Sequence, residues 1–225
     1  AGTVANDLAG FNNVGVYGPG TAKPTPGAGL VAGALTFDGV NDYAEVAHAT
    51  DVDILGNCVL DVAESFTIDF WVKTQSSAIL QTILDKRTNP GDPNLPIGYH
   101  VFLSNGRPGL QMSVGTTFSN FIAPTAVNDG QWHFVAIAVQ RCRPAAGNIY
   151  VDNNPPFTFQ PLLASLSNSA SLLIGKRQPA FTDNFFAGAL DELELFKRAL
   201  TAAEVQALFN AGSVGKCKNN CEPKA

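Results

Sequence analysis

Apolar and polar residues alternate along several short segments of the chain, and this alternation predicts a protein built mainly from β-strands. The clearest case is SFTIDFWVK at residues 65–73, in which every second residue from Phe66 to Val72 is apolar. A period of two places such residues on one face of a strand. Both faces of segment 132–139 are apolar, which predicts a central strand. Further strands are predicted at 79–85, 99–103, 110–114, 148–151, 171–174 and 189–196.

The segment ALTFDGVNDYAEV at residues 34–46 places two short apolar stretches around a turn rich in Asp, Gly and Asn. These residue types favour turns because their side chains or backbones suit tight chain reversal. We therefore predict a β-hairpin here. In contrast, KRTNPGDPNLPIG at residues 86–98 contains three prolines and predicts a long loop, since proline cannot donate to a strand ladder.

One helix is predicted near the C-terminal end of the sequence. Thr201 and Glu204 have the spacing of a capping box, in which each side chain binds the other residue's backbone N–H. Gly212 stands where a left-handed residue would end the helix. Three apolar residues fall on one face of this helix, namely Val205, Leu208 and Phe209.

Composition fits short strands joined by many turns. The 225 residues include 21 Gly and 14 Pro, while charged residues make up 15%. We predict one domain over residues 1–225, with a Gly/Pro-rich lead at about 18–33 and a cysteine-containing tail at 213–225. The net charge of −5, without a Lys/Arg run, argues against nucleic acid as a partner. No apolar run is long enough to predict membrane insertion, and the first residues lack the pattern of a signal peptide.

Four cysteines, an even number, are compatible with two disulfides in an exported protein. Three pairings are formally possible. Cys217 and Cys221 are close enough in sequence to close a local loop, which leaves Cys58–Cys142 as the long-range bridge, and we favour this arrangement. The alternative is four free thiols in a cytosolic protein.

The segments ALTFDGVNDYAEV, SFTIDFWVK, DGQWHFVAIAV, IYVDN and GALDELELFKRALTAAEV occur in the order seen in a known family. The chain resembles the laminin-G-like jelly-roll domains of the concanavalin A-like lectin/glucanase superfamily. This resemblance implies an all-β fold of two stacked antiparallel sheets, with one short C-terminal helix, in a secreted or cell-surface protein. It does not select a ligand, because relatives bind sugars, bind proteins or act as scaffolds.

The resemblance also implies a structural calcium ion near the junction of the first hairpin and the last strand. Its predicted ligands are Asp38, the carbonyl of Gly39 and Asp191, with Asn41 or Asp42 completing the shell. Calcium binds six to eight oxygen atoms, which suits these residues. The alternative is that Asp, Asn and Gly occur here only because they favour turns.

A carbohydrate site needs a flat aromatic surface beside hydrogen-bonding groups. Trp71, Asp69 and Lys73 share one face of a predicted strand, and neighbouring strands could add His100, Gln111 and Ser113 to that face. The alternative for Trp71 is burial under a loop. A second, weaker set of candidates for sugar contact consists of residues predicted to lie in loops, namely Arg107, Phe118 and Phe121.

Catalysis is not predicted. Retaining glycosidases hold two carboxylates about 5 Å apart, and the related laminarinase-like pattern E-x-D-x-x-E is not matched by DELE at residues 191–194. His48, His100 and His133 do not have metal-ligand spacing. The sequence therefore predicts a non-catalytic recognition module that binds a glycan or polysaccharide. The competing hypothesis is a structural or adhesive module that contacts proteins or self-associates. A third, less favoured hypothesis is a glycosidase or lyase that acts on polysaccharides.

Overall fold

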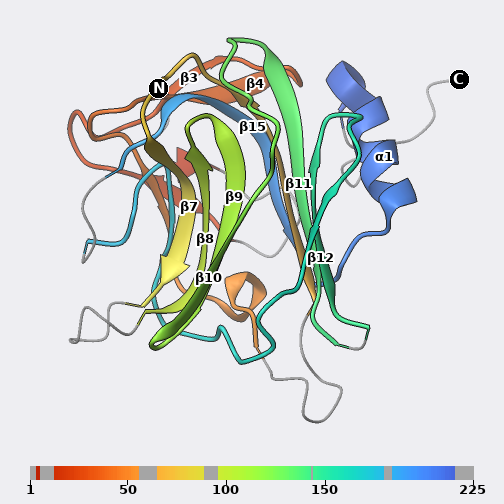
Figure 1. The fold of residues 1–225 in the computed structure, drawn as a ribbon. Helices are drawn as coiled ribbons and strands as arrows, with labels where there is room; N and C mark the ends of the chain where they lie inside the picture. Colours follow the sequence, from red (N-terminus) through yellow and green to blue (C-terminus); the bar gives the residue numbers. More distant parts are fainter. Residues whose placement is uncertain are drawn as a thin grey trace, which may run out of the picture.

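The computed structural model describes residues 4–5, 13–55, 65–88, 96–142, 144–179 and 184–215, and these form two antiparallel sheets packed face to face. Figure 1 shows strands β7 to β10 in one layer, β11 and β12 in the other, and helix α1 outside the second layer. The predicted all-β sandwich with one C-terminal helix is therefore confirmed.

Within the described residues, the first sheet has eight strands. Their order across the sheet is β1 (Val4–Ala5), β2 (Gly15–Tyr17), β5 (Ala44–Val46), β14 (Leu172–Ile174), β7 (Leu80–Arg87), β8 (Ile97–Ser104), β9 (Arg107–Val114) and β10 (Thr117–Ile122).

The second sheet has seven strands in the same described ranges. Their order is β13 (Phe157–Phe159), β12 (Ala146–Val151), β11 (Trp132–Gln140), β6 (Phe66–Lys73), β15 (Ala187–Phe196), β4 (Gly33–Asp38) and β3 (Thr25–Ala28). Strand β11 lies between β12 and β6, in agreement with the central position predicted from its two apolar faces.

The main core lies between the two sheets. On β6 the alternating residues Phe66, Ile68, Phe70 and Val72 are all buried in this core. The opposite sheet contributes the alternating residues of β8 and β9, namely Tyr99, Val101, Leu103, Leu110 and Met112. Since every second residue of a strand points to the opposite face, the residues between them lie on the outer faces of the sandwich.

Helix α1 (Ala202–Ala211) begins with the predicted capping box. Thr201 Oγ1 accepts a hydrogen bond from the Glu204 N–H at 3.3 Å, and Glu204 Oε2 accepts one from the Thr201 N–H at 2.8 Å. Gly212 follows the helix with φ of 47°. The short 3-10 turns Thr50–Val52 and Gly212–Val214 complete the described elements. None of the described helices is long and apolar enough to cross a membrane.

The structure corrects four expectations about the strands. The predicted hairpin at 34–46 is wrong, because β4 pairs with β15 and β3 whereas β5 pairs with β2 and β14 in the other sheet. The turn after Asp38 therefore carries the chain from one sheet to the other. The Gly/Pro-rich lead contributes β3, and the segments forming β10 and β13 are strands that the sequence did not predict. Strand β7 also continues to Arg87, two residues into the predicted loop.

The predicted disulfides fall largely outside the described residues. Cys142 is half-buried after β11, while Cys58, Cys217 and Cys221 lie in undescribed parts of the chain. Both pairings therefore stay predictions.

Candidate functional site

Trp71 lies on the outer side of the seven-stranded sheet, beneath helix α1. It is 6% exposed, and its ring stacks on Phe209 with centroids 6.0 Å apart and packs against Phe134 at 5.3 Å. Val205 and Leu200 belong to the same buried cluster. This burial overturns the interpretation of Trp71 as an open sugar platform, because the helix already covers the ring.

The other residues predicted on this face are also in the wrong place for a shared sugar site. Asp69 is fully buried, whereas Lys73 is exposed at the end of β6. His100, Gln111 and Ser113 lie on β8 and β9 in the other sheet. The alternation rule correctly grouped residues within each strand, but the two groups lie on opposite outer faces of the sandwich.

The outer face of the eight-stranded sheet does bring His100, Gln111 and Ser113 together. His100 pairs with Gln111 across β8 and β9. Ser113 Oγ donates to Gln111 Oε1 at 3.3 Å, and His100 Nε2 lies 3.1 Å from Thr82 Oγ1. His100 and Ser113 are buried, while Gln111 is half-buried and reaches toward the surface.

A buried ion pair supports Gln111 from β7. Arg87 Nε donates to Asp85 Oδ1 at 2.8 Å, and a second guanidinium nitrogen donates to Asp85 Oδ2. Another nitrogen of Arg87 donates to Gln111 Oε1. Both charged side chains are buried. Because a buried pair persists only when its hydrogen bonds are satisfied, this arrangement fixes the orientation of the Gln111 amide.

Strand β10 adds an exposed aromatic ring beside this amide. Phe118 is 60% exposed, and the register places it opposite Ser113 and places Asn120 opposite Gln111. Directly opposite residues share a face, and Phe118 and Gln111 are diagonal neighbours about 7–8 Å apart. Gln111 Nε2 donates to Asn120 Oδ1 at 2.8 Å. We call Gln111, Phe118 and Asn120 the Phe118 surface.

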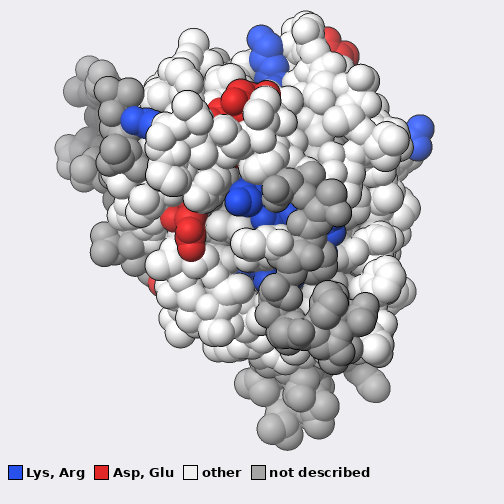
Figure 2. Space-filling model, turned by 90° about the vertical axis from the view of Figure 1, so that its left-hand side faces the viewer, with Lys and Arg blue, Asp and Glu red and all other residues white. Residues whose placement is uncertain are grey.

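Basic side chains lie near the centre of this face. Figure 2 looks onto it and shows Lys and Arg atoms gathered there. Burial lowers the pKa of His100 well below its usual value, and the charges of Arg87 and Arg177 lower it further. His100 is therefore neutral at physiological pH. Burial also lowers the pKa of Arg177, as does the charge of Arg87.

Sequence reasoning missed Arg87, Asn120 and Arg177, and it treated Phe118 and Phe121 as loop residues. The alternation in TFSNFI, from Thr117 to Ile122, was the available signal for β10. Phe121 points inward and stacks on Phe159 at 4.0 Å, so it does not belong to the surface. Arg107, also predicted as a sugar contact, is exposed at the far end of β9.

The predicted calcium ligands do not converge. Ala187 is opposite Asp38 in the register of β15 and β4, so Asp191 lies four residues further along. Four strand residues span about 13 Å, which exceeds what one ion can bridge. Asp38 Oδ1 instead accepts the N–H groups of Val40, Asn41 and Asp42, and Asp191 Oδ2 accepts the N–H of Val31 at 2.8 Å.

The carboxylate of Asp42 likewise accepts a hydrogen bond, from the Asp38 N–H. These three carboxylates therefore stabilise turns. Gly39, with φ of 77°, completes the turn that follows Asp38. Within the described parts of the chain, no cluster of three or more His, Cys, Asp or Glu side chains could hold a metal ion. The set Asp38, Gly39 and Asp191 does not fit one calcium ion, and calcium binding itself stays a prediction.

Because Asp38 and Asp191 cannot share an ion, chelation with EDTA is expected to leave the Tm unchanged if no calcium binds elsewhere on the chain. Differential scanning calorimetry of the untreated and chelated protein measures this. A Tm that falls with EDTA and returns with added calcium would show that a stabilising ion binds elsewhere.

His133 lies between two aspartates on the other side of the molecule. Its Nδ1 is 2.7 Å from Asp152 Oδ2, and its Nε2 is 2.9 Å from Asp129 Oδ1. Burial lowers the pKa of His133, but the hydrogen bonds and charges of Asp152 and Asp129 together raise it above its usual value. The folded state thus favours the protonated imidazolium.

Because the pKa of His133 is raised in the folded state, His133 stabilises the fold at pH values below its unfolded-state pKa of about 6.5. This stabilisation is lost as the pH rises through the pKa of the folded state. We therefore expect His133→Gln to destabilise the protein most near pH 6, by up to about 1 kcal/mol, and less near pH 9. Urea unfolding of both proteins at each pH measures the difference. A difference that does not change with pH would contradict this assignment.

Comparisons with known proteins agree on the fold. A family model described as the concanavalin A-like lectin/glucanases superfamily, laminin-G type, matches residues 38–206. The binding domain of Paraclostridial Mosquitocidal Protein 1 is similar with a TM-score of 0.69 and 16% identity, over 92% of this chain and 49% of that one.

Two further structures show the same architecture. A botulinum neurotoxin type C structure has a TM-score of 0.61 and 14% identity, over 90% of this chain and 47% of that one. The heptameric SAP-like pentraxin from Limulus polyphemus has a TM-score of 0.57 and 15% identity, over 82% of this chain and 84% of the pentraxin. The chain thus spans about half the length of the two toxin structures.

Proposed function

Because the chain belongs to the laminin-G type of the concanavalin A-like lectin/glucanases superfamily, we propose that it is a non-catalytic recognition module that binds carbohydrate. The observation that carries this proposal is the Phe118 surface, where an exposed ring lies beside two oriented amides. An aromatic ring can stack on the C–H face of a sugar, and planar amides can bind its hydroxyls.

The similar proteins support a recognition function. Cell entry of botulinum neurotoxin type C is described as dependent on interaction with two ganglioside molecules. The structure of the mosquitocidal protein is that of its binding domain. Gangliosides carry glycan head groups, so we propose a glycan ligand for this chain as well. We propose that the module acts outside the cell, on a secreted or cell-surface protein.

Asp85 of β7 and the exposed Glu45 of β5 both lie on this face, with Leu173 of β14 between them, and Asp85 suits structure better than catalysis. A glycosidase acid/base pair needs two carboxylates facing the scissile bond. Asp85 is buried and bound by Arg87, and burial raises its pKa while Arg87 opposes that rise. Its hydrogen bonds position Arg87, which in turn positions Gln111.

Phe118→Ala is expected to weaken glycan binding about tenfold or more while leaving the fold intact, because it removes the stacking ring from an exposed position. A glycan array identifies the ligand, and calorimetry then compares the variants. Asn120→Ala should weaken binding less, since it removes one amide.

Ile79→Ala is the matched control, since Ile79 is an exposed apolar residue beside Asn105, at the opposite end of the strands. If Phe118→Ala and Ile79→Ala bind the ligand equally well, the Phe118 surface is not the site. A silent array combined with stable oligomers in sizing experiments would favour the structural or adhesive alternative.

A further inference from the structure

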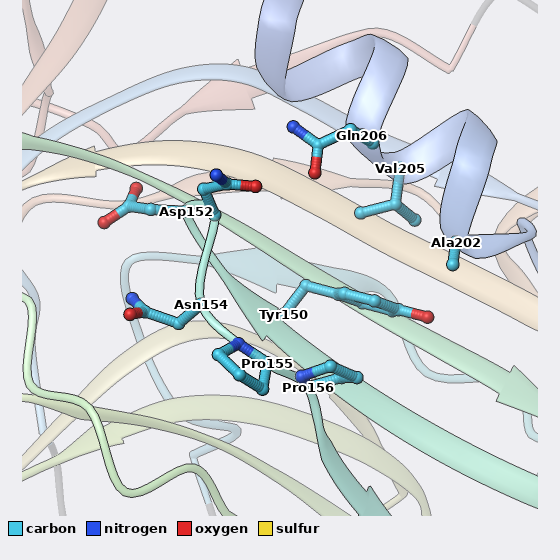
Figure 3. A pocket seen from close by; sticks show the side chains of 9 residues that line it. Tyr150, Asp152, Asn154, Pro155, Pro156, Ala202, Val205 and Gln206 are labelled. Carbon is cyan, nitrogen blue, oxygen red and sulfur yellow. The ribbon is translucent and has the colours of Figure 1, made fainter.

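A groove of about 280 Å³ lies between helix α1 and the turn that joins β12 to β13 (Figure 3). Tyr150, Pro155 and Pro156 line it on the sheet side, and Ala202 and Gln206 line it on the helix side. It belongs to the outer side of the seven-stranded sheet, so it is separate from the Phe118 surface on the other sheet.

The groove exists because a small residue stands where the helix approaches the turn. The larger apolar residues of α1, Val205 and Phe209, pack on the cluster around Trp71. Ala202, at the first position of the helix, lines the groove with only a methyl group.

The walls combine apolar rings with hydrogen-bonding groups. The Tyr150 ring and the two prolines offer apolar surface, and the Tyr150 hydroxyl points toward the helix (Figure 3). Gln206 Nε2 donates to Asn210 Oδ1 at 3.0 Å, and Figure 3 shows the Gln206 carbonyl oxygen on the side of Tyr150. Asn153 adds an exposed amide at the rim.

The turn that forms one wall is held rigidly. Asp152 Oδ1 accepts the Phe134 N–H at 2.8 Å, and Asp152 Oδ2 lies 2.7 Å from His133 Nδ1. Asn154 Nδ2 donates to the Val151 carbonyl at 2.9 Å. The two prolines that follow have fixed φ angles. A ligand would therefore meet a preformed wall and would lose little affinity to ordering it.

We propose that this groove binds a single neutral sugar ring. Its volume is near the lower end of small-molecule sites, which suits one six-membered ring better than a longer chain. The ring's C–H face matches Tyr150 and the prolines, and its hydroxyls match the amides of Gln206 and Asn153. No Lys, Arg or His is among the described residues that line the groove, so an acidic sugar would find no cation there.

The test is an NMR titration of the intact chain with methyl glycosides of glucose, galactose, mannose and N-acetylglucosamine, and with glucuronic and N-acetylneuraminic acids. We expect at least one neutral glycoside to shift the amide signals of Tyr150, Asn153 and Gln206, with a Kd on the order of 1 mM. The two acids should leave these signals unmoved.

Ala202→Phe fills the groove from an exposed helix position and is expected to weaken this binding at least tenfold. Ala207→Phe is the matched control, since Ala207 is exposed on the same helix and does not line the groove. Phe118→Ala should bind like the parent, which separates this site from the Phe118 surface. Asn153→Ala, at an exposed position, should also weaken binding and guards against a folding defect in Ala202→Phe.

Three outcomes would overturn the proposal. One is that no neutral glycoside shifts these signals at concentrations on the order of 10 mM, well above the expected Kd. Another is that well-folded Ala202→Phe and Asn153→Ala bind like the parent. The third is that the acidic sugars bind the groove as well as the neutral ones do.

Discussion

Trp71→Ala is expected to lower the free energy of unfolding by about 3–5 kcal/mol, the range typical of deleting a large buried aromatic side chain. Trp71 contacts both the sheet residue Phe134 and the helix residue Phe209. Its loss therefore opens a cavity and also removes the main contact that holds α1 on the sheet. For a chain of this size the Tm should fall by roughly 10 °C. Thermal unfolding followed by circular dichroism measures this change.

Phe118→Ala provides the contrast, because its ring is largely exposed and its loss should change stability by about 0.5 kcal/mol or less. The two variants thus separate structure from recognition: Trp71→Ala should lose stability, and Phe118→Ala should lose glycan affinity. If Trp71→Ala kept its Tm but lost glycan binding, the original interpretation of Trp71 as a sugar platform would be restored.

The orientation of side chains on single strands and the start of the helix could be predicted, because both depend on short-range sequence patterns. Alternation in residues 65–73 correctly separated the core residues Phe66 and Ile68 from Thr67 and Trp71 on the outer face. The capping box at Thr201 and Glu204 depends on residues three apart, and the structure confirms it. Both patterns are decided within a few residues of backbone.

The same patterns could not predict which strands contribute side chains to the same outer face of the sandwich. A period of two shows which residues of one strand share a face, but it does not show which sheet the strand joins. Trp71 and His100 were therefore grouped, although β6 and β8 belong to different sheets. The burial of Trp71 also depends on a helix that follows it by about 130 residues in sequence, and short-range patterns carry no information on such contacts.

The calcium prediction failed in its geometry for a related reason. Asp38 and Asp191 do lie on neighbouring strands, as expected, but the register offsets them by four residues. Register is set by the packing of whole strands. The acidic segment DELE has a structural role that does not need an ion. Asp191 stabilises the turn before β4 by accepting the Val31 N–H, and a bulge follows Asp191 in β15.

Arg87→Ala is expected to destabilise the protein by about 3–5 kcal/mol, because it leaves the carboxylate of Asp85 buried without its partner. Burial already raises the pKa of Asp85, and Arg87 opposes that rise. Without Arg87 the pKa should rise further, so the folded variant favours the protonated acid. A group with a raised folded pKa stabilises the fold at low pH, and the defect should therefore be smaller near pH 5 than near pH 8.

Urea unfolding at both pH values measures this defect, and Arg107→Ala, an exposed arginine on β9, is the control that should change stability by about 0.5 kcal/mol or less. The double variant Asp85→Asn, Arg87→Met should lose less stability than the sum of its single variants, by about 1–3 kcal/mol, since neither buried charge remains. Additive losses would mean that the pair is not coupled. Because Arg87 also donates to Gln111, coupling between Asp85 and Arg87 would link the buried pair to the orientation of the amide in the Phe118 surface.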